Sequence, residues 1–183
     1  MKKLVSFFLA LVMLLSLAAC GEGGLSLNPK ETESQKDGYI GDTLPTFWFD
    51  FTVDDAYRCS EYHGYTPAPG NKLIVATITL KNTCGYSVDM WGDDFVILWE
   101  REAGGDIDME LALPAGISDD QFPDEYLLGI NASKSCVAVY EVPEEYRDFA
   151  IAFMEIFEDE DDPSNEEGVD GDTYFVYFTP EDK

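Results

Sequence analysis

Apolar and polar side chains alternate with a period of two along several segments of this chain. In TFWFDFTV, residues 46–53, every second residue is apolar, namely Phe47, Phe49, Phe51 and Val53. Successive side chains of an extended strand point to opposite faces, so this pattern indicates a half-buried β-strand. The run LIVATITL, residues 73–80, is β-branched and apolar on both faces, as a central strand would be.

Four further segments have the composition of strands and are bounded by Pro, Gly, Asn or Asp. They are DDFVILW (93–99), SCVAVYEV (135–142), DFAIAFMEIF (148–157) and TYFVYF (173–178). Several short strands with turns between them predict an all-β fold, an antiparallel sandwich of two sheets. A closed barrel is the alternative architecture.

The N-terminal segment has the features of a secretion signal. Two lysines precede sixteen uncharged residues, 4–19, which is shorter than the ~20 residues of a membrane-spanning helix. The segment ends in Leu-Ala-Ala-Cys, which resembles the bacterial lipobox, where the cysteine is alkylated by a diacylglyceryl group. We therefore expect residues 1–19 to be a lipoprotein signal peptide and Cys20 to be lipidated, with a retained transmembrane helix as the alternative.

This assignment predicts the organisation and location of the chain. Residues 20–43 are rich in Gly, Ser, Lys and Glu without hydrophobic periodicity, which predicts a lipidated cysteine followed by a flexible tether. Residues 44–180 are long enough for one β-sandwich domain with its own core. The expected location is the extracytoplasmic face of the cell membrane, with the membrane as a partner through the lipid on Cys20.

The charge balance limits the partners. The chain has 37 Asp and Glu against 11 Lys and Arg, a formal net charge of −26. Nucleic acids and anionic membrane surfaces are bound through clustered Lys and Arg, so we expect no nucleic-acid partner.

A second resemblance concerns the middle of the chain. Residues 60–83, SEYHGYTPAPGNKLIVATITLKNT, resemble the signature of a Gram-positive lipoprotein family, the domain of unknown function 4352. The matching positions are Tyr62, Gly64, Tyr65, Pro67, Gly70, Asn71, Lys72, Lys81 and Asn82, followed by Asp94 and Phe95 and by VYEVPEEYRDFAI at 139–151. The resemblance spans roughly residues 41–178. The turn at residues 130–134 departs from the Gly-Glu pair that is common in the family.

The resemblance implies an immunoglobulin-like sandwich, because the family is similar to the secreted immunoprotective antigen of mycobacteria. It carries no established catalytic residues. It also implies that the strands at 73–81 and 135–142 lie close together. Side-chain parity permits any pairing of Cys59, Cys84 and Cys136, and this proximity favours a Cys84–Cys136 disulfide.

Few residues suggest chemistry. The only histidine, His63, follows Cys59 by four residues, but no third group is apparent to orient a Cys–His pair, so we expect a surface histidine and no catalytic residues. The cysteines lack metal-site spacing, and no nucleotide or cofactor motif is present, so no cofactor is expected. Tyr62, His63 and Tyr65 form the best candidate recognition loop.

Residues 155–172 hold ten acids and no base, which predicts a solvated hairpin loop. Five consecutive carboxylates permit weak calcium binding, with Asp159, Asp161 and Asp162 as the speculative ligands, and no firm metal site is predicted.

The expected function is that of a membrane-anchored extracellular lipoprotein that presents a non-enzymatic binding or interaction module. Its partner would be an unknown extracellular protein or small ligand. The alternatives are an envelope hydrolase that uses two carboxylates and a passive accessory subunit of a surface complex.

Overall fold

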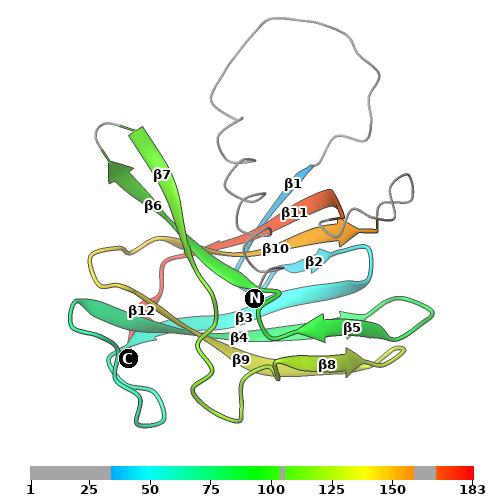
Figure 1. The fold of residues 1–183 in the computed structure, drawn as a ribbon, viewed down its shortest axis with the longest axis horizontal. Coiled ribbons are helices and arrows are strands. Elements are labelled where there is room, and N and C mark those ends of the chain that lie inside the picture. The colour runs from blue at the N-terminus through cyan, green and yellow to red at the C-terminus, as the bar shows by residue number, and fades with distance from the viewer. Residues whose placement is uncertain (1–33, 104–105, 159–167) are drawn as a thin grey trace, which may run out of the picture.

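The computed structural model describes residues 34–103, 106–158 and 168–183, and these form an all-β sandwich of two main sheets (Figure 1). Sheet A has the strand order β1-β11-β10-β6-β7, and sheet B has the order β12-β3-β4-β9 with β2 paired to β3. Sheet A comprises β1 (Gln35–Tyr39), β11 (Val169–Phe178), β10 (Phe149–Phe157), β6 (Val96–Ala103) and β7 (Asp106–Ala112). Sheet B comprises β12 (Glu181–Asp182), β3 (Phe49–Cys59), β4 (Asn71–Asn82), β9 (Ser133–Pro143) and β2 (Thr43–Pro45). A small ribbon pairs β5 (Val88–Trp91) with β8 (Glu125–Leu128).

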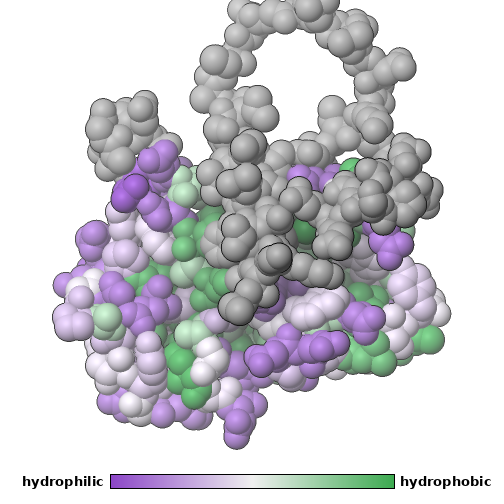
Figure 2. All heavy atoms as spheres, in the orientation of Figure 1, coloured by the Kyte–Doolittle hydropathy of each residue, from purple (hydrophilic) through white to green (hydrophobic). Residues whose placement is uncertain are grey.

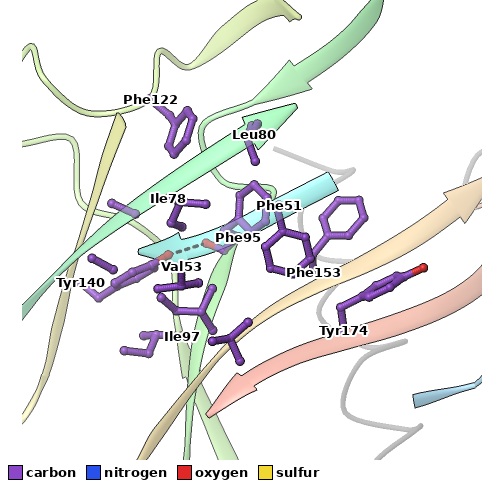
Figure 3. Close-up of a cluster of buried hydrophobic side chains, with 14 of the residues drawn as sticks. Phe51, Val53, Ile78, Leu80, Phe95, Ile97, Phe122, Tyr140, Phe153 and Tyr174 are labelled. Atoms are coloured by element: carbon purple, nitrogen blue, oxygen red, sulfur yellow. Dashed lines mark hydrogen bonds between the residues drawn. The ribbon is translucent and has the colours of Figure 1, made fainter. Parts of the chain in front are cut away.

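The core lies between the two sheets and is rich in aromatic side chains. Phe95, just before β6, lies 5.3 Å from Phe51 and 5.5 Å from Phe153 between ring centroids. The hydroxyl of the fully buried Tyr140 donates a hydrogen bond to the Phe95 carbonyl at 3.1 Å (Figure 3). Both sheets therefore contribute to one core, as a sandwich requires, and no closed barrel forms from the described strands.

The central strand of sheet B confirms the sequence pattern. Alternate residues of β4 face the core and are fully buried: Ile74, Ala76, Ile78 and Leu80. The opposite face of β4 is buried too, because Leu73 and Val75 pack with Val139 and the half-buried Ile117 of the β7–β8 connection. Apolar residues on both faces of this strand thus reflect cover on both sides.

One residue of the alternating segment 46–53 departs from the prediction. Phe49, Phe51 and Val53 are buried, but Phe47 is 62% exposed. The strand begins only at Phe49, because a turn closed by the Thr46–Phe49 backbone hydrogen bond precedes it. The Phe47 amide donates to the buried Glu155 carboxylate at 2.6 Å, which holds this turn against sheet A.

The domain is longer than the predicted 44–180. β1 falls within the predicted tether 20–43 and pairs in parallel with β11, and β12 pairs in parallel with β3, so the sandwich is not purely antiparallel. Both strands lie at sheet edges, where backbone pairing suffices and an apolar face is not required. Their sequences, QKDGY and ED, therefore lack the pattern that identified the other strands.

The hairpin β10–β11 contains the acidic stretch. The register pairs Phe157 with Val169, so β11 starts four residues before the predicted Thr173.

Hydrophilic and apolar residues are interleaved over the visible described surface (Figure 2). Among the described residues, no helix is long and apolar enough to cross a membrane.

Candidate functional site

Two connections meet at one end of the sandwich, at the left of Figure 1. The β3–β4 loop contains the predicted recognition residues, and the β9–β10 turn follows Pro143. The Glu144 amide donates to the Gly70 carbonyl at 2.9 Å and joins the two connections. Loops at one end of a rigid sandwich are a common place for recognition, so this end is the first candidate site.

The tip of the β3–β4 loop is a tight turn. Tyr62 and Tyr65 exchange backbone hydrogen bonds of 3.0 and 2.9 Å across His63 and Gly64. Both central residues have positive φ, 48° for His63 and 83° for Gly64, as a type I′ turn requires. The tripeptide Tyr-His-Gly is therefore bent back on itself and exposes the imidazole.

Two carboxylates hold this loop, one on sheet B and one in the β7–β8 connection. Glu141 of β9 accepts the Tyr65 hydroxyl at 2.7 Å, the Ala68 amide at 2.9 Å and the Asn71 side chain at 2.7 Å. Hydrogen bonds from Tyr65 and Asn71 hold the pKa of the Glu141 carboxyl below its usual value. Charge-assisted hydrogen bonds thus fix this part of the loop.

Asp120 is the second carboxylate, and it holds Tyr62 as Glu141 holds Tyr65. It accepts the Tyr62 hydroxyl at 2.5 Å and lies 3.8 Å from His63 Nε2. Hydrogen bonds from Ser118 and Tyr62 lower the pKa of the Asp120 carboxyl, while burial and the Asp120 hydrogen bond raise the pKa of Tyr62. The predicted recognition residues are therefore brought together, with both hydroxyls already engaged.

A groove opens on the other side of the β9–β10 turn, over the outer face of sheet A. It encloses about 660 Å³, within the range of about 300–1,000 Å³ that is typical of small-molecule sites. Its lining residues include six aromatics: Tyr39, Trp99, Tyr146, Phe149, Tyr177 and Phe178. Tyr39 and Tyr177 lie on the outer face of sheet A, whereas the other four belong to the inter-sheet core or pack against it. The remaining lining residues are Leu98, Glu100, Met109, Glu145, Arg147, Asp148, Ala150 and Thr179.

The strand register explains the groove. Tyr39 pairs with Tyr177, Tyr177 with Ala150, and Ala150 with Leu98, so these four side chains form one row across four strands. Directly opposed residues share a face of the sheet. The small Ala150 therefore lies between two large neighbours and forms the low point of the groove.

Some charged side chains of the groove have an ion-pair or hydrogen-bond partner, and others have no cationic partner. The Arg147 guanidinium lies 3.6 Å from Asp182, and Asp148 accepts the Thr179 hydroxyl at 2.5 Å. Glu100 and Glu145 are exposed, and among the described residues no cation pairs with either carboxylate. The groove therefore carries unneutralised negative charge beside its aromatic wall.

The predicted disulfide is not formed. Cys59, Cys84 and Cys136 are all free. Cys136 lies opposite Ile78, whereas Cys84 follows Asn82, the last residue of β4. The strand advances about 13 Å between Ile78 and Asn82, and bridged cysteines have Cα atoms within about 7 Å. Parity gave the correct face for Cys136 but the wrong one for Cys59, because the register shift between Val53 and Asp55 turns Cys59 to the outer face of sheet B beside Leu73 and Val75.

Cys59 and His63 lie in different surroundings. Cys59 is buried beside Leu73 and Val139, and burial raises the pKa of its thiol. The His63 ring lies 4.5 Å from the Tyr62 ring between centroids, tilted by 42°, and His63 faces Asp120. A buried thiol of raised pKa is a poor nucleophile.

The speculative calcium ligands Asp159, Asp161 and Asp162 lie outside the described residues, as does Cys20. Within the described part of the chain, no three His, Cys, Asp or Glu side chains form a group that could hold a metal ion.

Comparisons with known proteins bear on the fold. No protein-family model and no curated protein matches the chain. A structure of an uncharacterized β-sandwich protein from Clostridium difficile 630 is 13% identical with a TM-score of 0.50, and the match covers 84% of this chain and 100% of that one. A candidate lipoprotein from Bacillus subtilis is 9% identical with a TM-score of 0.51, over 81% of this chain. The chain spans 39% of the length of the Bacillus protein. This chain therefore has a β-sandwich fold resembling that of a candidate lipoprotein.

Proposed function

We propose that this chain is a lipid-anchored, non-enzymatic binding module on the extracytoplasmic face of the cell membrane. The groove over sheet A is its ligand site. The signal-like N-terminus and the resemblance to the domain of unknown function 4352 support the anchor at Cys20. The similarity to a candidate lipoprotein is consistent with it.

The observation that carries the binding role is the groove of about 660 Å³ with the exposed Tyr39 and the half-buried Tyr177 on its wall. Aromatic rings supply large contact areas at low cost in side-chain entropy, and small-molecule sites are mostly apolar with a few polar groups. Five strands (β1, β6, β7, β10 and β11) and the β9–β10 turn hold this lining, so little ordering is required when a ligand binds.

A screen for groove-dependent binding tests this role. The full chain is incubated with neutral, anionic and cationic small molecules and with short saccharides, and binding is detected by ligand-observed NMR. Ala150→Leu fills the low point, and Tyr177→Leu removes a wall ring. We expect both variants to lose binding while Tyr86→Leu, at a 53% exposed tyrosine outside the lining, retains it. Binding that survives both groove variants contradicts the proposal.

The anchor has its own test. A fatty-acid probe should label the wild-type chain in a Gram-positive host, and Cys20→Ser should abolish the label. Equal labelling of both proteins contradicts lipidation at this residue.

A hydrolase is the second candidate, because Glu100, Glu145 and Asp148 line the same groove. Glycosidases use two carboxylates about 5–9.5 Å apart. Release of reducing ends from cell-wall glycans, abolished by Glu100→Gln or Glu145→Gln, would favour this candidate over a binding module. A passive accessory subunit would show neither binding nor hydrolysis.

A further inference from the structure

We infer that the ligand of the sheet A groove is a small organic cation, held against the rings of Tyr39 and Tyr177 and neutralised by Glu100. This inference rests on the proposed binding function and names its ligand class. It follows from ring geometry, from exposure and from the distribution of charge in the groove.

The two tyrosines form an open aromatic corner. Their ring centroids lie 6.4 Å apart with the planes inclined at 49°. Tyr39 is 66% exposed, and its backbone is fixed by pairing with Tyr177 and by a hydrogen bond from its amide to Asp42 at 2.9 Å. The face of an aromatic ring carries negative potential and attracts cations within about 6 Å of its centroid.

The charges near this aromatic corner are negative, which favours a cationic ligand. Glu100 lines the groove. Burial raises the pKa of the Tyr177 hydroxyl, and the charges of Asp37, Tyr39 and, least, Glu100 raise it further. Among the described residues that line the groove, Arg147 is the only cationic one, and its guanidinium lies 3.6 Å from Asp182. An anionic ligand would therefore meet uncompensated repulsion, whereas a cation would meet a carboxylate and two ring faces.

A second exposed carboxylate, Glu145 of the β9–β10 turn, also lines the groove. The nearby Trp99 and Tyr146 pack with the inter-sheet core and do not extend the aromatic corner. Quaternary and alkylated ammonium groups are bound in proteins by several aromatic faces together. The groove offers two such faces, from Tyr39 on β1 and Tyr177 on β11.

The affinities of choline and of its neutral isostere, in which carbon replaces the ammonium nitrogen, are compared. The two molecules have the same shape, so a difference in affinity measures the effect of the positive charge. Titration calorimetry with the full chain should give roughly fivefold tighter binding of choline, the increment expected for a partly exposed cation–π contact. Raising the salt to about 0.5 M should reduce this advantage, because exposed charges are screened.

Matched variants locate the effect. Glu100→Gln and Tyr39→Leu should each weaken choline binding several-fold, whereas Glu125→Gln, an exposed carboxylate on β8, should not change it. The inference is overturned if choline does not bind, if the isostere binds equally well, or if Glu125→Gln weakens binding as much as Glu100→Gln. A neutral or anionic ligand that depends on Ala150 and Tyr177 would overturn the cation assignment but leave the binding function in place.

Discussion

Arg58 and Asp182 form a bidentate ion pair that ties the last strand, β12, to β3 of sheet B. Arg58 Nε lies 2.6 Å from Asp182 Oδ1, and the guanidinium also contacts Oδ2 at 3.0 Å. Arg58 is 3% exposed and donates further to the carbonyls of Glu144 and Tyr146. One buried guanidinium thus fixes both the C-terminal strand and the turn that borders the groove.

Asp182→Asn should lower the free energy of unfolding by about 1–2 kcal/mol, because the buried guanidinium loses its charged acceptor. The measurement is urea denaturation monitored by tryptophan fluorescence. Asp89→Asn, at an exposed position of β5, is the control and should change stability by less than about 0.5 kcal/mol. Equal effects of the two substitutions would contradict the role of the Arg58 pair.

Tyr126 and Tyr140, whose hydroxyls are both buried, should respond differently to loss of the hydroxyl. Among the described residues, only the Tyr126 hydroxyl is a buried side-chain polar atom without a hydrogen-bond partner, whereas Tyr140 donates to Phe95. Tyr126→Phe should leave stability unchanged or raise it by up to about 1 kcal/mol, and Tyr140→Phe should lower it by about 1 kcal/mol. Thermal melts of both variants decide this, and a large loss at Tyr126 would reveal an unrecognised partner.

Asp94 should make the protein less stable as pH rises. Burial raises the pKa of its carboxyl to about 7 from the usual 3.8. The folded state therefore binds more protons than the unfolded state between about pH 4 and 7, and stability falls with pH across that window. The unfolding free energy of wild type minus that of Asp94→Asn, from urea titrations at several pH values, should fall as pH rises from about 4 to 7. A constant difference would contradict the raised pKa.

The stability of the β3–β4 loop against local opening should depend on the Glu141 carboxylate. Its carboxyl has a lowered pKa, so its stabilising effect is present above the unfolded value of about 4.5 and is lost as pH falls through the lower folded value. Glu141→Ala should speed hydrogen exchange of the Ala68 amide roughly tenfold, because the amide loses its charged acceptor. Glu61→Ala, at an exposed residue of the same loop, should leave this exchange unchanged.

Strands in which every second residue is apolar could be predicted from the sequence. Their alternation arises because one face of the strand is buried in the core and the other is not. Phe49, Phe51 and Val53 of β3 and alternate residues of β4 are buried as expected. The edge strands β1 and β12 were missed, since backbone pairing holds them and their side chains are polar.

The candidate site was predictable only in part. The Tyr62–Tyr65 turn is local in sequence, and His-Gly at its tip is a recognisable signal. The groove depends on the register of β1, β6, β10 and β11, which brings Tyr39, Leu98, Ala150 and Tyr177 into one row. No local pattern encodes that row. The cysteine pairing was missed for the same reason, because position along paired strands is set by register.

Amide chemical-shift mapping tests the central claim most directly. The full chain is titrated with choline, or with the tightest ligand from the screen, and backbone amide shifts are followed. A groove site predicts that the largest shifts cluster at Tyr39, Glu100, Ala150 and Tyr177 and are absent from Ala150→Leu. Shifts confined to the Tyr62–Tyr65 turn, or spread evenly over the surface, would contradict a ligand site in the sheet A groove.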